Sequence, residues 1–99
     1  MKIAVPAEAL DETRVAATPE TVKKFIGLGA EFVVQAGAGN GSRLPDADYA
    51  AAGATIAPDA ATTVTDADIV LKVRRPTESE LGAYKPGALV VATMDQYGH

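Results

Sequence analysis

The stretch TPETVKKFIGLGAEFVVQA, residues 18–36, predicts a helix followed by a strand, and this pair decides the fold. Thr18 can cap the helix with its hydroxyl, and Pro19 suits the first helical position. Gly29 is a natural stop for the helix. Residues 31–36 then form a short apolar run that is typical of a buried strand. One face of the helix is apolar at helical spacing through Val22, Phe25 and Ile26.

The same alternation continues in both directions along the chain. Continuous apolar strands separated by helical connections indicate a parallel sheet with helices on both faces. The 99 residues are therefore expected to form a single α/β domain with a five-stranded, flavodoxin-like or Rossmann-like sheet. Because parallel crossovers are right-handed, few topologies remain, and the strand order 2-1-3-4-5 is the simplest. Further strands are expected at residues 3–5, 54–57, 67–73 and 88–94, and further helices at residues 46–52, 60–64 and 78–84.

The expected sheet has five strands but only four helices, so the last helix is lacking. In the order 2-1-3-4-5, the helix that begins at Pro19 would cover its face of the sheet alone. The fifth strand, residues 88–94, would then expose part of an apolar face, which soluble monomers rarely tolerate over a large area. We therefore expect either a homo-oligomer, most simply a two-fold dimer, or a longer parent protein that covers this strand.

Composition argues against several functional classes. The net charge is −4 and the isoelectric point is near 4.8, so a nucleic-acid partner is not expected. The chain has no cysteine, which excludes a disulfide and a thiolate metal site. Its single histidine, His99, is expected to be solvated rather than a metal ligand. No apolar run approaches the ~20 residues of a membrane span, so direct membrane insertion is not expected.

The glycine-rich stretch GAGNGS, residues 37–42, follows an expected strand, as a dinucleotide-binding fingerprint would. In the G-x-G-x-x-G pattern, however, the third glycine would fall at Ser42. The next helix begins later, after Pro45, so its N-terminus is misplaced for a pyrophosphate. We expect a plain strand-to-helix loop here, with anion binding as the minor alternative.

Arg14 and Lys72 are the main candidates for a binding site. Ligands of parallel α/β sheets bind beyond the carboxyl ends of the strands. Arg14 lies in the loop after the first strand, and Lys72 lies near the end of the fourth strand, within an apolar run. We expect both to face one crevice, separated by one intervening strand or roughly 10 Å, where they would suit a small carboxylate or a sulfate. The residues leave an alternative open, in which Arg14 pairs with Asp11 or Glu12 and Lys72 extends to solvent.

Two further sites are less well supported. Arg74 and Arg75 follow the same strand, where a solvated basic pair is expected rather than a phosphate site. Asp59 follows the third strand, as the phospho-acceptor of a receiver domain does. The acidic pair and the lysine that such a domain requires are incomplete at residues 6–8 and 95–96, so this interpretation is not favoured.

Several segments together resemble one known family. Their order and spacing are similar to the N-terminal domain of the family that contains alanine dehydrogenases and the alpha subunits of proton-translocating NAD(P) transhydrogenases. The match covers essentially the whole chain. The segments are MKIAVPAE at residues 1–8, ETRVAATPETVKKFIGLGAEFVV at 12–34, AGAG at 36–39, YAAAGATI at 49–56, ADIVLKVRRP at 67–76 and GALVVATMDQYG at 87–98.

The resemblance gives Arg14 and Lys72 a role. They match the arginine and lysine that hold the substrate carboxylate in alanine dehydrogenase. Alanine dehydrogenases also carry a catalytic histidine at the end of the fifth strand, where this chain has Met94-Asp95. The resemblance therefore favours the transhydrogenase branch and assigns no catalytic residue to this chain.

In that branch, the parent protein would transfer hydride between NADH and NADP, coupled to proton translocation. It would work with other transhydrogenase subunits at the cytoplasmic side of the inner membrane. NAD would be bound by a second domain beyond residue 99, so the 99 residues alone are expected to be inactive and to bind no cofactor usefully. The alternatives are an alanine dehydrogenase-like N-terminal domain and a non-catalytic binding or assembly module on the same scaffold.

Overall fold

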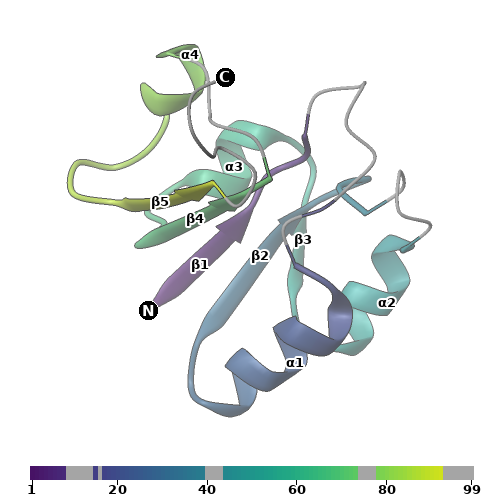
Figure 1. The fold of residues 1–99 in the computed structure, drawn as a ribbon. Helices are drawn as coiled ribbons and strands as arrows, with labels where there is room; N and C mark the ends of the chain where they lie inside the picture. The colour runs from purple at the N-terminus through teal and green to yellow at the C-terminus, as the bar shows by residue number, and fades with distance from the viewer. Residues whose placement is uncertain (9–14, 16, 40–43, 74–77, 93–99) are drawn as a thin grey trace.

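The computed structural model describes residues 1–8, 15, 17–39, 44–73 and 78–92, in which strands and helices alternate (Figure 1). All five strands pair in parallel, which confirms the five-stranded α/β sheet expected from the sequence. The strands are β1 (Lys2–Val5), β2 (Glu31–Gln35), β3 (Thr55–Ala57), β4 (Ile69–Lys72) and β5 (Leu89–Ala92). The helices are α1 (Pro19–Gly27), α2 (Asp46–Ala51), α3 (Ala60–Val64) and α4 (Glu78–Leu81).

The strand order is β3-β2-β1-β4-β5, so the expected order 2-1-3-4-5 is wrong. That order would have placed β3 in the centre of the sheet. Instead β3 lies at an edge of the sheet. An edge position suits a strand of only three residues whose first residue, Thr55, is exposed. The central strand is β1, whose Ile3, Ala4 and Val5 are all buried. The result is the Rossmann-type arrangement, in which the chain reverses direction across the sheet between β1 and β4.

The helices form two layers, one on each face of the sheet. On one face α1 and α2 contact each other, so α1 does not cover its face alone as expected. On the opposite face α3 crosses behind the sheet (Figure 1), with the turn after α4 packed nearby. The first core contains Val22 of α1 and Tyr49 of α2, packed against Ile3, Val5, Phe32 and Val34. The second contains Val64 of α3, packed against Ala4, Ala67 and Val70.

Local signals placed two helix starts correctly. The Thr18 hydroxyl accepts a hydrogen bond from the Thr21 N–H at 3.3 Å, and Pro19 is the first residue of α1. Asp59 caps α3 by accepting from the Thr62 N–H at 2.7 Å. These side chains satisfy amide groups that have no partner within the helix.

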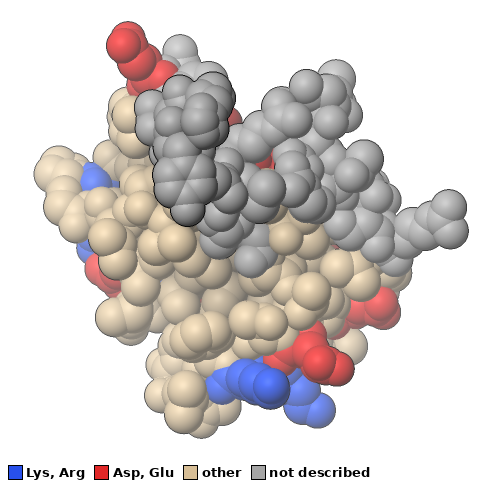
Figure 2. All heavy atoms as spheres, viewed as in Figure 1, with Lys and Arg blue, Asp and Glu red and all other residues tan. Residues whose placement is uncertain are grey.

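The fifth strand exposes apolar side chains, as expected, but the cause differs from the one inferred. Leu89 is 58 % exposed and Val91 is 37 % exposed, on the face that carries α1 and α2. Within the part of the chain that the structure describes, these two helices pack against β2 and β3, while Leu89 and Val91 of β5 remain exposed. Seen from this side, the described surface is largely uncharged between the acidic and basic groups at its margins (Figure 2). None of the described helices has the length and apolar character needed to cross a membrane.

Candidate functional site

The carboxyl ends of β1 and β4 meet at the centre of the sheet, where parallel α/β proteins bind ligands. These strands are direct neighbours, with Ile3 opposite Ile69 and Ala4 opposite Val70. The expected intervening strand between the first and fourth strands is therefore wrong, because it depended on the wrong strand order. Adjacent strands lie about 4.8 Å apart, and Arg14 itself lies outside the described residues.

Lys72 is the last residue of β4 and is buried, with 3 % of its side chain exposed. It alternates with Leu71 and lies on the same face of the strand as Val70, which packs against α3. The alternative in which Lys72 extends to solvent is thus wrong. A buried ammonium needs a counter-charge, because removing it from water is costly.

Glu8 supplies one counter-charge from the segment that follows β1. Its side chain is 2 % exposed, and its Oε1 lies 3.6 Å from the Lys72 Nζ. Its other oxygen, Oε2, accepts a hydrogen bond from the Val73 N–H at 2.9 Å. Glu8 therefore connects the ends of β1 and β4 through both its charge and its hydrogen-bonding capacity.

Glu80 supplies a second counter-charge from α4. The Lys72 Nζ donates a hydrogen bond to the Glu80 Oε2 at 3.3 Å, and the Glu80 side chain is 38 % exposed. Glu8, Lys72 and Glu80 are referred to below as the Lys72 cluster. Among the described residues, this cluster contains one ammonium and two carboxylates.

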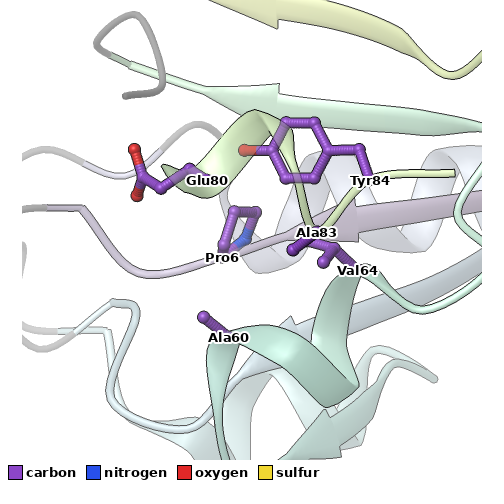
Figure 3. A pocket seen from close by; sticks show the side chains of 6 residues that line it. All are labelled: Pro6, Ala60, Val64, Glu80, Ala83 and Tyr84. Carbon is purple, nitrogen blue, oxygen red and sulfur yellow. The ribbon is translucent and has the colours of Figure 1, made fainter. Parts of the chain in front are cut away.

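A small cavity adjoins the cluster on the α3 side of the sheet (Figure 3). Its volume of about 30 Å³ exceeds the ~10–15 Å³ that one water molecule requires. The hydroxyl of Tyr84 is buried and has no hydrogen-bond partner within the part of the chain that the structure describes. Burial, together with the negative charges of Glu80 and Glu8, raises the pKa of Tyr84 to about 12. The cavity is lined by Pro6, Ala60, Val64, Glu80, Ala83 and Tyr84.

Among the charged candidates from the sequence, Lys72 and Asp59 lie within the described residues. Arg14, the adjacent basic pair Arg74 and Arg75, and His99 lie outside the described residues. Asp59 is an exposed helix cap, and its hydrogen bonds with Thr62 hold the pKa of its carboxyl below the ordinary value. The described residues contain no group of three side chains suited to hold a metal ion.

Within the described part of the glycine-rich stretch, Gly37 and Gly39 pack in a way that does not favour a dinucleotide. A side chain at Gly39 would collide with the Leu44 carbonyl and would place its Cβ 2.8 Å from the Tyr49 ring. Gly37 donates its N–H to the Asp46 carboxylate at 2.9 Å. Asp46 and Asp48 occupy the first turn of α2, where their negative charges would repel a pyrophosphate. Gly37 and Gly39 therefore serve the packing of the loop on α2, and residues 40–42 of the stretch lie outside the described residues.

Sequence reasoning missed Glu8, Glu80 and Tyr84 as members of the site. The position of Glu8, two residues after Pro6 and close to the carboxyl end of the first strand, could have indicated a role in the site. This inference would have required the correct pairing of β1 with β4. Glu80 and Tyr84 lie four residues apart and depend on how α4 packs, which no local pattern specifies.

Comparison with known proteins identifies the family of the chain. The family model described as alanine dehydrogenase/PNT, N-terminal domain, matches residues 4–99. The chain is 52 % identical over 83 residues to an NAD(P) transhydrogenase subunit alpha polypeptide of Rhodospirillum rubrum, covering 83 % of this chain and 22 % of that protein. It is 43 % identical over 88 residues to alanine dehydrogenase of Halomonas elongata, covering 88 % of this chain and 24 % of that protein.

Solved structures show the same relationship. The crystal structure of transhydrogenase from Sinorhizobium meliloti matches with a TM-score of 0.90 and 47 % identity, covering all of this chain and 30 % of that chain. An L-alanine dehydrogenase matches with a TM-score of 0.85 and 31 % identity, covering 91 % of this chain and 25 % of that chain. The chain thus spans less than a third of the length of each of these relatives. It belongs to the alanine dehydrogenase/PNT N-terminal domain family.

Proposed function

We propose that this chain is the N-terminal segment of the NAD(H)-binding alpha subunit of an NAD(P) transhydrogenase, which transfers hydride between NADH and NADP coupled to proton translocation. The observation that carries the proposal is the 52 % identity to a transhydrogenase subunit alpha, against 43 % to an alanine dehydrogenase. Met94-Asp95, in place of a histidine after the fifth strand, supports the same choice.

We further propose a small-carboxylate site at Lys72, with Arg14 as its second cation. The buried ammonium of Lys72 supports this assignment, because it lies at the carboxyl end of β4, next to the β1–β4 pair at which the chain reverses direction across the sheet. A guanidinium and an ammonium together suit a carboxylate better than either does alone. Within this site the chain's own residues would bind and orient a ligand, and none of them is assigned a proton-transfer step.

The remaining assignments concern the parent protein. NAD would be bound by another domain, because the glycine-rich loop on α2 offers an acidic helix start instead of a pyrophosphate cradle. The partners would be other transhydrogenase subunits at the cytoplasmic side of the inner membrane. A second copy of the chain, or another segment of the parent, would cover the exposed Leu89 and Val91.

The test compares two reactions in the protein that carries this chain, purified with its partner subunits. We expect NADPH to reduce an NAD analogue, and we expect alanine to produce no NADH. Alanine-dependent formation of NADH without transhydrogenation would overturn the proposal and establish the alanine dehydrogenase-like alternative. Absence of both reactions would support the non-catalytic module instead.

A further inference from the structure

We propose that the cavity between α3 and α4 is a hydration site, in which a water molecule links the hydroxyl of Tyr84 to the carboxylate of Glu80. The ligand it takes is a neutral molecule of about the size of water that accepts one hydrogen bond and donates another. This inference does not depend on the function proposed above, because it gives no ligand-binding role to Lys72 or Arg14.

The Tyr84 hydroxyl is the group that requires a partner. Its oxygen is buried and has no hydrogen-bond partner among the described residues. Buried hydroxyls in native proteins are nearly always bonded to the protein or to an ordered water, because an unsatisfied one is costly. Tyr49 follows this rule within the protein, since its hydroxyl donates to the Ala17 carbonyl at 2.6 Å. For Tyr84, a partner from the solvent meets the same requirement.

The cavity lies where such a partner is needed. Tyr84 and Glu80 both line it, and the Tyr84 hydroxyl is directed towards the side from which Glu80 projects (Figure 3). The volume of about 30 Å³ is enough for one or two water molecules, because each requires ~10–15 Å³. Ala60 and Ala83 also line the cavity and are exposed, so water can enter from the surface.

Glu80 provides the second polar contact. A carboxylate can accept several hydrogen bonds at once, so a bond from water is compatible with the bond from Lys72 at 3.3 Å and with the other interactions of Glu80. Glu80 and Tyr84 are close enough for the charge of one to affect the other, yet they share no direct hydrogen bond. Polar groups separated in this way are commonly bridged by water.

The protonation state of Tyr84 determines what kind of molecule fits. Burial, together with the negative charges of Glu80 and Glu8, raises the pKa of Tyr84 to about 12. The phenol therefore keeps its proton at neutral pH and acts as the donor, so the occupant must accept a hydrogen bond from it. The same occupant faces a carboxylate and must donate to it. A water molecule does both.

A high-resolution crystal structure of the full chain tests the site directly. We expect an ordered water about 2.7–2.8 Å from the Tyr84 hydroxyl oxygen and within hydrogen-bond distance of a Glu80 oxygen. In Tyr84→Phe the water loses its partner on the ring, so its density should disappear. Three results would each overturn the proposal: no water in the wild type, a protein group in its place, or density that persists unchanged in Tyr84→Phe.

Urea unfolding of the same proteins gives an independent measurement. If a water is bonded to the Tyr84 hydroxyl, Tyr84→Phe should lower the folding equilibrium constant by about two- to tenfold, the net effect of one hydrogen bond. If the hydroxyl is unsatisfied, the same change relieves a cost and raises the constant. A constant that rises or stays unchanged would therefore overturn the proposal. Tyr49→Phe is the matched reference and should lower the constant, because it removes a hydroxyl that has a direct partner in the protein.

Discussion

Replacing Glu8 by glutamine removes a buried charge from the segment that follows β1 while keeping the shape of the side chain. At 3.6 Å, the attraction between Glu8 and Lys72 is about 4–5 kcal/mol for an effective dielectric constant of 20. The net loss is smaller, because glutamine is cheaper to bury than glutamate and because Glu80 still lies 3.3 Å from the ammonium. Leaving a buried charge without a partner costs about 3–5 kcal/mol, so we expect the variant to lose about 2–3 kcal/mol of unfolding free energy.

Urea denaturation at neutral pH measures this loss directly. In thermal unfolding, the same loss should lower the melting temperature of a domain of this size by roughly 10–20 °C. Glu78→Gln is the control on an exposed position and should remain within about 0.5 kcal/mol of the wild type. The double variant Glu8→Gln/Lys72→Met should recover much of the loss, because neither side chain then carries a buried charge. A Glu8→Gln variant as stable as the wild type would refute the reasoning.

Four further outcomes are expected. Gly39→Ala should lose about 1–3 kcal/mol in urea unfolding, because its methyl group would collide with Leu44 and Tyr49; wild-type stability would contradict this. Hydrogen bonds from Lys85 and from the Lys2 N–H lower the pKa of Asp68, so its stabilisation is present above the unfolded-state pKa near 4 and is lost as pH falls through the folded-state pKa. The stability difference between wild type and Asp68→Asn should accordingly be larger at pH 7 than at pH 3, and a constant difference would disprove it. Calorimetric titration of the chain with NADH should show no binding stronger than the millimolar range, about −4 kcal/mol, and a micromolar constant would overturn that expectation. In sedimentation equilibrium at micromolar concentration we expect self-association that Leu89→Lys weakens, and a monomeric wild type would count against a second copy as the cover of β5.

The elements of the fold could be predicted because their signals are local. Thr18 and Pro19 specify the start of α1 within two residues, and Asp59 does the same for α3. The strand order could not be predicted in this way. Alternation and handedness permit β3 either in the centre or at the edge, and only the pairing of its three residues decides between them.

The residues of the candidate site also differ in whether the local sequence could indicate them. Lys72 could be found because a lysine inside an apolar strand is chemically conspicuous. Glu8 could not, because its significance depends on β1 and β4 being neighbours. The burial of the Tyr84 hydroxyl could not be predicted from the sequence, because a tyrosine after a short helix is compatible with many environments.

The central position of β1 has a consequence for how the chain folds during synthesis. The Lys2 N–H bonds to the Asp68 side chain across 66 positions of the sequence, and β1 can pair with β4 only after that distance has been translated. At a synthesis rate of about 5–20 residues per second, one edge of β1 would remain unpaired for roughly 3–13 s. Until then the β1–β2 pair exposes an unpaired apolar edge to other nascent chains. Slow codons between residues 35 and 69 would lengthen this interval, so the mRNA itself would influence how much of the protein reaches the native sheet.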